Sequence, residues 1–345
     1  MWSDNTTNPK TSGVKNNSMI TRTRAEYGGF LPLELNEGQE YFKDYSGCLR
    51  RYNSVKAALY YLIDSVPIKH IYIPYYYCPT TTQAIKNTGI DVSFYHITQD
   101  LLPEELPDEA DSAVLLVNYF GVRSEKINSL ASCFSKAVVV VDNAHAFFTD
   151  PFIAKGIYQL YSAKKFFGIP DGAYLIGEGV SAQQEPPGYS YEYADYLLLT
   201  YEAGTNAAYG KKKSADSYIG NNPGTMSALS VGLLGNVDYA NVRKKRESNF
   251  RCLNEKLSGW NELSLPEVCA AYQYPLYIPA KGRELKRKLI EKKIYVPTLW
   301  RGEDLMRDGN AFELSMSDDA VFLPVDQRYD DDDMNYIADT VLSLR

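Results

Sequence analysis

The sequence of 345 residues predicts an α/β protein, with a three-layer α/β/α large domain around a mostly parallel sheet and a small C-terminal α+β domain. Two continuous apolar runs, SAVLLVNYFG (112–121) and KAVVVVDNAHA (136–146), are typical of strands buried on both faces, as in a parallel sheet. Helical and strand-like segments alternate from about Arg50, which indicates a sheet covered by helices. The length also favours one large and one smaller domain.

In the first half of the chain, helices and strands are expected to alternate. Asn53 or Ser54 can cap a helix over SVKAALYYLID. Short β-branched or aromatic runs predict strands, and a glycine closes the second helix. The expected segments that follow are the strand 70–76, the helix 80–89, the strand 90–97, the two apolar strands, and two final strands within 156–168 and 171–179.

After the sheet, the sequence predicts a long helical stretch over residues 226–257 and then a compact α+β domain. The expected elements of that domain are a strand, a helix followed by a strand, a strand and a helix, within residues 273–280, 283–300, 320–329 and 332–344. We expect an N-terminal arm at 1–25, a large domain at 26–240 and a small domain at 241–345.

Composition argues against several classes of function. The net charge of −7 and the pI near 5.2 do not suit a surface that binds nucleic acid. Five scattered cysteines without a CxxC pair, with only three histidines, give no metal-ligand spacing, so no metal is expected. No apolar run approaches the ~20 residues that cross a bilayer, and the polar N-terminus lacks a signal-peptide core. A soluble, cytoplasmic protein without a membrane partner is therefore expected.

Polar residues close the two apolar runs, at the edge of the sheet where open α/β folds bind ligands. These residues are Asn118 and Asp142. A buried carboxylate needs a specific partner, and a protonated pyridinium nitrogen would be one. The alternative is that Asp142 only caps the turn that follows it.

The segment YSAKKFFGIPDGAYL places a lysine pair in apolar, aromatic surroundings. Such surroundings disfavour the ammonium form, and a neutral amine is the nucleophile that bonds to an aldehyde cofactor. The alternative is an ordinary surface pair, Lys164 and Lys165. The helix start at Ser54 offers backbone N–H groups to a phosphate, with Ser54 or Lys56 as further donors, although any helix start shares this property.

A helix start, an aspartate that ends a strand and a lysine 23 residues later occur in the order used by fold-type I pyridoxal-phosphate enzymes. The chain resembles a divergent branch of the DegT/DnrJ aminotransferases. DNAHAFF is similar to the family motif of an Asp followed three residues later by His or Gln. YSAKKFFGIPDGAYL is similar to the family's Ser…Lys…Gly-Asp/Glu-Gly-Gly segment. The resemblance runs from about Tyr27 to the C-terminal strands.

The resemblance implies roles for individual residues. Lys165, six residues before Asp171, would carry pyridoxal 5′-phosphate, and Asp142 would pair with the pyridine nitrogen. His145 would lie close to the cofactor, with a core histidine as the alternative. The phosphate would be held by Ser162 and by the helix start, which supplies Ser54, Val55 and Lys56.

The chain also departs from the family pattern. The usual Ser-Gly-Thr at the first helix is replaced by Ser54-Val55-Lys56. Tyr77 and Cys78 occupy the region where the family stacks an aromatic side chain on the cofactor ring. The family's Asn-x-Arg segment, which reaches across the dimer, is replaced by NNPGTMS, where Asn222 is the candidate contact.

The resemblance implies transfer of an amino group from an amino acid to a nucleotide-linked keto-sugar, in sugar or polysaccharide biosynthesis. The donor that the resemblance implies is glutamate. A homodimer with the active site at the interface is implied as well. Two alternatives stay open: a pyridoxal-phosphate enzyme with another reaction on a small amine or ketone, and a non-catalytic regulatory or scaffold protein. Arg301 and Arg328 are expected to form ion pairs rather than to bind substrate.

Overall fold

The computed structural model describes residues 28–181 and 185–345, of which residues 35–345 form one compact unit. The arm expected at residues 1–25 lies outside the described residues. A seven-stranded sheet has the strand order β1-β7-β6-β5-β4-β2-β3. Its strands are β1 (Leu49–Tyr52), β2 (His70–Pro74), β3 (Asp91–Tyr95), β4 (Ser112–Val117), β5 (Val138–Asn143), β6 (Ile157–Ser162) and β7 (Ala173–Gly177).

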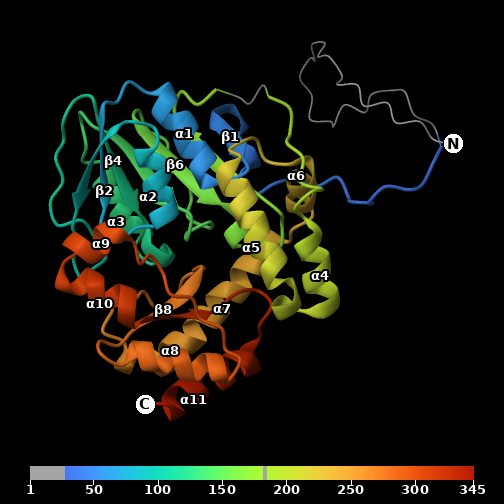
Figure 1. The fold of residues 1–345 in the computed structure, drawn as a ribbon, viewed down its shortest axis with the longest axis vertical. Helices are drawn as coiled ribbons and strands as arrows, with labels where there is room; N and C mark the ends of the chain where they lie inside the picture. Colours follow the sequence, from blue (N-terminus) through green and yellow to red (C-terminus); the bar gives the residue numbers. More distant parts are fainter. Residues whose placement is uncertain (1–27, 182–184) are drawn as a thin grey trace. The chain divides into compact units, whose positions relative to one another are not determined.

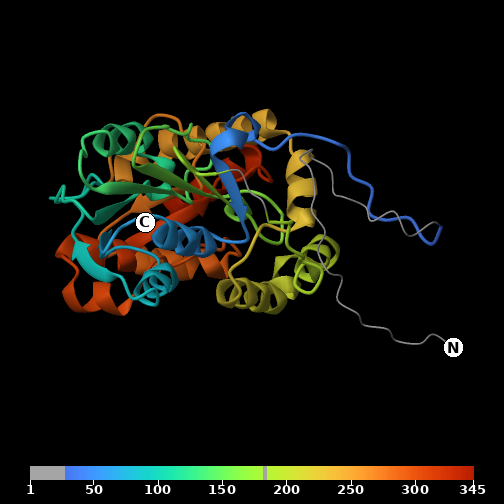
Figure 2. The same ribbon diagram turned by 90° about the horizontal axis from the view of Figure 1, so that it is seen from above.

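The neighbours from β3 to β6 pair in parallel, whereas β7 is antiparallel to β6 and β1 is antiparallel to β7. Helices cover both faces of the sheet, as Figures 1 and 2 show. Leu115 and Val140 pack in the cluster that contains α1 (Val55–Ser65), whereas their neighbours Val114 and Val139 pack in the cluster that contains α3 (Ser124–Ala131). This alternation explains why the strands are apolar at every position, and it confirms the three-layer prediction.

Local sequence signals place the first two helices. Ser54 caps α1, because its hydroxyl accepts a hydrogen bond from the Ala57 N–H at 3.2 Å. The next helix, α2 (Pro79–Lys86), begins with a proline at its first position and follows Cys78. Both helix starts therefore lie close to the ends of strands.

The C-terminal part is built around a two-stranded antiparallel sheet of β8 (Gln273–Tyr277) and β9 (Ala320–Pro324). The helices α7 (Tyr239–Leu257), α8 (Gly282–Glu291), α9 (Glu303–Asp308), α10 (Ala311–Asp319) and α11 (Asp331–Ser343) belong to this part. Figure 1 shows these orange and red elements gathered together. This α+β arrangement confirms the predicted fold class, while the boundary at residue 240 stays a prediction. Within the described residues, no helix has both the length and the apolar character that a bilayer crossing requires.

The structure corrects several secondary-structure predictions. The long helix expected over 226–257 is two helices, α6 (Ala228–Gly235) and α7, since Asp238 caps the second one by accepting from the Asn241 N–H at 3.0 Å. The strand expected before Trp300 does not form. Its ends, Lys293 and Trp300, have positive φ angles of 63° and 62°, which no strand tolerates.

Among the described residues, five helices and one strand were not expected from the sequence. They are β1, α3, α4 (Asp195–Ala203), α5 (Thr205–Asn221), α9 and α10. The hairpin of α4 and α5 buries few side chains, so its sequence lacks a strong apolar stripe. The sequence did not predict these two helices because their apolar residues do not form a clear stripe along one face.

Candidate active site

A pocket of about 180 Å³ lies beyond the carboxyl ends of β4, β5 and β6. All but one of the side chains singled out from the sequence line it. They are Ser54, Val55, Lys56, Tyr77, Cys78, Asn118, Asp142, His145, Ser162 and Lys165. The parallel strands bring these residues together, because their carboxyl ends share one edge of the sheet.

Asp142 belongs to β5 and lies buried at the pocket wall, 5% exposed. One carboxylate oxygen accepts from the Ala144 N–H at 2.8 Å, and the other accepts from the Tyr77 hydroxyl at 2.5 Å. Among the described residues, Asp142 forms no ion pair. Burial raises the pKa of Asp142, although the bonds from Tyr77 and Ala144 and the charge of Lys165 oppose this shift. A cation in the pocket would therefore stabilise the carboxylate.

The hydrogen bond from the Ala144 N–H is the turn cap that the sequence predicts as the alternative role of Asp142. It uses only one carboxylate oxygen, so both roles are compatible in one side chain. Tyr77 uses the other oxygen and is itself buried, at 3% exposed. Tyr77 is thus a hydrogen-bond donor to the candidate acid.

Lys165 ends a short 3₁₀ turn, Ala163–Lys165, directly after β6. Its Nζ lies 2.9 Å from His145 Nε2 and 5.4 Å from the centre of the Tyr272 ring. Burial, and secondarily the charge of Lys165, holds the pKa of His145 well below its usual value. The imidazole is therefore neutral, and its Nε2 can accept a hydrogen bond from the Lys165 amine.

His145 lies in an aromatic stack. Its ring centre is 5.1 Å from that of Trp300 and 4.7 Å from that of Tyr272. Its Nδ1 is buried and has no hydrogen-bond partner within the described residues. A core histidine satisfied by the backbone would have used that atom, so the geometry favours a role for His145 toward the pocket.

The start of α1 also lines the pocket, as do Ser162, Lys56 and Lys164. The first N–H groups of a helix have no intrahelical acceptor, and the dipole of α1 points its positive end here. Gly172, with φ +142°, lines the same region, and a Cβ there would lie 3.0 Å from Ile169 Cδ1. A residue with a side chain would be strained in this conformation.

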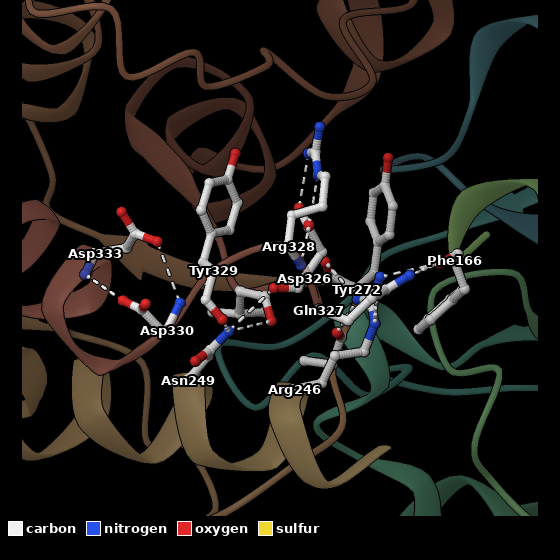
Figure 3. Close-up of polar contacts among 12 residues, drawn as sticks. Phe166, Arg246, Asn249, Tyr272, Asp326, Gln327, Arg328, Tyr329, Asp330 and Asp333 are labelled. Carbon is white, nitrogen blue, oxygen red and sulfur yellow. Dashed lines mark hydrogen bonds and ion pairs between the residues drawn. The ribbon is translucent and has the colours of Figure 1, made fainter. Parts of the chain in front are cut away.

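A buried arginine supports the segment that carries Lys165. Arg246 of α7 donates to the carbonyl of Ala271 at 2.9 Å and that of Tyr272 at 3.3 Å, and also to the Phe166 carbonyl at 3.4 Å. Gln327 donates to the same Phe166 carbonyl at 2.8 Å. Figure 3 shows these polar groups converging beside Phe166. The C-terminal part thus holds the backbone of Phe166, which follows Lys165 in the chain, and the backbone of Tyr272, whose ring lies 5.4 Å from Lys165 Nζ.

Cys78 precedes α2, and its Sγ lies 3.4 Å from Thr80 Oγ1. Burial alone would raise the pKa of this thiol, but Lys165 and hydrogen bonds from Thr80 and Thr81 bring it below its usual value.

Asn118 is buried and donates to Ser124 at 3.0 Å and to Asn143 at 2.9 Å. It braces neighbouring segments at the pocket edge.

Asn222 is the predicted residue that does not line the pocket. It directly follows α5, and its side chain donates to the Tyr218 carbonyl at 2.8 Å. The contact across a dimer that the resemblance implies for Asn222 stays a prediction. Arg301 pairs with Asp318 at 2.9 Å and Arg328 with Asp326 at 2.7 Å, so the predicted ion pairs are confirmed.

Sequence reasoning missed several wall residues: Asn53, Thr81, Lys164, Gly172, Asp216, Ile219, Gly220 and Trp300. The sequence places Lys164 only in the alternative surface pair with Lys165. Asp216, Ile219 and Gly220 lie on the unpredicted helix α5, and no local pattern marks them. For Trp300 the available signal was a large aromatic residue in a Pro-containing segment, which is weak by itself.

The donor set fits pyridoxal phosphate. An anion would meet the start of α1, Ser162 and two lysines at one end of the pocket. A protonated ring nitrogen would meet the buried carboxylate of Asp142, which has no ion pair among the described residues. The amine of Lys165 lines the same pocket.

No protein-family model and no curated protein matches the chain by sequence. Solved structures do match it. An aminotransferase of the DegT DnrJ EryC1 StrS type from Brucella abortus matches with a TM-score of 0.58 and 14% identity, over 88% of this chain and 87% of that one. PseC from Helicobacter pylori, an aminotransferase of pseudoaminic acid biosynthesis, matches with a TM-score of 0.56 and 14% identity, over 86% of each chain.

Spr1654 from Streptococcus pneumoniae, described as a sugar aminotransferase in its PLP-form, matches with a TM-score of 0.59 and 14% identity, over 88% of each chain. Identity at this level establishes the fold and not the reaction. The chain therefore has the fold-type I architecture seen in the DegT/DnrJ/EryC1/StrS sugar aminotransferases.

Proposed function

We propose that the chain is a pyridoxal-phosphate-dependent aminotransferase that moves an amino group from an amino acid to a keto-sugar. One observation carries the proposal: the amine of Lys165, the buried carboxylate of Asp142 and the start of α1 line one pocket. That pocket lies in a fold shared with sugar aminotransferases. The family resemblance adds glutamate as the donor and a nucleotide-linked sugar as the acceptor.

Bound pyridoxal phosphate would supply an aldehyde that links covalently to an amine and a ring that withdraws electrons from the linked carbon. Lys165 would hold the cofactor, and its freed Nζ would then remove the proton from the α-carbon of the donor amino acid. In the second half of the reaction the same amine would deliver a proton to the carbon that was the acceptor's carbonyl carbon. Two-step kinetics follow, because the amino group leaves the donor before the acceptor reacts.

The neighbours of Lys165 support these proton movements. His145 Nε2 lies 2.9 Å from Lys165 Nζ, and the low pKa of His145 keeps the imidazole neutral and able to accept a hydrogen bond. Asp142 would keep a proton on the ring nitrogen, since a buried carboxylate is stabilised by a cation beside it. Tyr77 holds that carboxylate in place through its 2.5 Å hydrogen bond.

The size of the pocket bears on the acceptor. Its volume of about 180 Å³ is below the ~300–1,000 Å³ typical of sites that enclose a whole drug-sized ligand. A nucleotide-linked sugar would therefore place only its keto-sugar end near Lys165 and keep its nucleotide outside the pocket. A second copy of the chain could cover the nucleotide, so a homodimer belongs to the proposal, as does a cytoplasmic location.

The test begins with attachment of the cofactor. The wild-type protein, incubated with pyridoxal phosphate and dialysed, should retain its yellow absorbance, and borohydride reduction followed by peptide mass analysis should place the label on Lys165. Lys165→Ala should lose the label, whereas Lys155→Ala, at an exposed lysine, should keep it. A label on Lys164, or no label at all, would end the proposal.

The substrates are tested next. A donor amino acid should bleach the yellow absorbance, and a keto-sugar should restore it. Absorbance that no amino acid changes would favour a non-catalytic protein. Release of ammonia or water from the substrate instead of restoration by a ketone would favour another pyridoxal-phosphate reaction.

A further inference from the structure

A helical hairpin of the same chain contributes three residues to the lining of the pocket. It consists of α4 and α5, which pack against each other around Ala208, Ala215 and Ile219. Figure 1 shows the two helices side by side. Near the end of α5, Asp216, Ile219 and Gly220 line the pocket where α1 begins.

Two contacts attach α5 to this end of the pocket. The Nζ of Lys56 donates to the Gly220 carbonyl at 3.3 Å. The Nζ of Lys164 pairs with Asp216 at 2.7 Å. Both lysines line the pocket. Lys56 is itself predicted to hold a phosphate, and Lys164 lies two positions after Ser162, which is predicted to do so as well. The helix α5 therefore holds the ammonium groups of Lys56 and Lys164 close to the start of α1.

Lys164 and Lys212 share Asp216 but differ in position. The side chain of Lys164 is 16% exposed and lines the pocket. The side chain of Lys212 is 40% exposed, lies one turn before Asp216 on α5 and is not part of the pocket wall. Asp216 thus pairs with two ammonium groups, that of Lys164 in the pocket wall and that of Lys212 outside it.

The ammonium group of Lys164 lies in an environment that disfavours its positive charge. Burial, followed by repulsion from Lys212, lowers the pKa of Lys164, and Asp216 only partly offsets this. Lys56, Lys164 and the positive end of α1 lie here, and the carboxylate of Asp216 opposes the charge of Lys164 together with the weaker effect of Asp171. A phosphate group would restore the balance of charge and form charge-assisted hydrogen bonds with Lys164.

We propose that Lys164 is a phosphate-binding residue of the cofactor pocket and that Asp216 of α5 positions its ammonium group there. The proposal rests on the proposed function, because pyridoxal phosphate provides the phosphate. The competing explanation is an ion pair that only attaches α5 to the sheet. That explanation predicts a loss of stability without any effect on the recognition of phosphate.

The experiment compares two ligands that differ only in the phosphate. Apo-protein is titrated with pyridoxal phosphate and with pyridoxal, and the absorbance of the attached ligand gives an apparent Kd for each. The ratio of the two Kd values measures recognition of the phosphate, independently of turnover. The variants are Lys164→Gln, Lys164→Arg and the matched control Lys212→Gln.

We expect Lys164→Gln to reduce the preference for pyridoxal phosphate about tenfold or more, with pyridoxal affinity nearly unchanged, since one charge-assisted hydrogen bond is lost. Lys164→Arg should restore much of the preference, and Lys212→Gln should leave it within about twofold. Unchanged pyridoxal binding also demonstrates that the variant is folded.

Two results would overturn the assignment. One is a Lys164→Gln variant with the wild-type preference, and the other is an equal loss of affinity for both ligands, which indicates general damage to the pocket. In either case wild-type attachment at Lys165 leaves the proposed function standing. Failure of the wild-type protein to attach either ligand removes both proposals.

Discussion

The pocket has two walls of different origin. The inner wall, Asp142, His145 and Lys165, comes from the ends of β5 and β6 and the turns that follow them. The outer wall, Lys164 with its partner Asp216, Gly220 and Trp300, depends on α5 and on an irregular segment of the C-terminal part. Sheet topology fixes the inner wall, whereas packing between distant segments makes the outer wall. We infer that chemistry shared by the fold belongs to the inner wall and that ligand selection belongs to the outer wall.

The largest effect is expected at the inner wall. Asp142→Asn should lower the rate of the donor half-reaction about tenfold to a hundredfold, because the charge-assisted bond to the ring nitrogen is lost. Stopped-flow measurement of the bleaching of the yellow absorbance tests this. Glu125→Gln, at an exposed carboxylate in the first turn of α3, should leave the rate unchanged.

The same variant should affect the apo-protein in the opposite direction. The pKa of Asp142 is raised in the folded state, so its contribution to stability is present below the unfolded pKa and is lost as the pH rises through the folded pKa. Apo Asp142→Asn should therefore melt at a higher temperature than the wild type near pH 7. The difference should shrink below about pH 4. A lower melting temperature at pH 7 would contradict the assignment of a desolvated acid.

A second test concerns the support beneath the inner wall. Arg246→Leu leaves the carbonyls of Ala271 and Tyr272 without this donor and the Phe166 carbonyl with Gln327 alone, and should destabilise the protein by about 3 kcal/mol. Arg243→Leu, one turn earlier on α7 in an exposed pair with Glu247, should cost less than about 1 kcal/mol. Chemical denaturation followed by circular dichroism compares them. Equal losses would mean that Arg246 does not brace the segment around Lys165.

The outer wall is tested at Trp300. Trp300→Ala removes the ring that stacks on His145. This change should raise the KM for the acceptor about tenfold, while the rate of the donor half-reaction changes less. Trp260→Ala, at a tryptophan outside the pocket, is the control. Equal changes in both half-reactions would place Trp300 with the inner wall instead.

The smallest expected effect is a difference in cysteine reactivity. Because the pKa of Cys78 is lowered and that of Cys252 is raised, iodoacetamide at pH 8 should label Cys78 severalfold faster than the similarly half-buried Cys252. Pyridoxal phosphate should slow only the labelling of Cys78. Peptide mass analysis measures both rates, and an equal slowing at both cysteines would argue that the ligand binds elsewhere.

The inner wall was predictable because its signals are local. The run VVVVDNAHA marks a buried strand that ends in a carboxylate, and YSAKKFFG marks a lysine in apolar surroundings after the next strand. Parallel pairing then brings Asp142 and Lys165 to the same edge without further information. The cap at Ser54 was predictable for the same reason, since it needs only the residues of its own helix.

The sequence by itself determined the α/β architecture and the strand-end residues, because periodicity and caps act over a few neighbouring positions. Only the tertiary structure decided which residues complete the pocket. Lys164 meets Asp216 across 52 residues, and the His145 ring stacks on Trp300 from the C-terminal part. Such contacts depend on how helices and loops pack against distant parts of the chain, and no pattern over a few neighbouring positions records that packing.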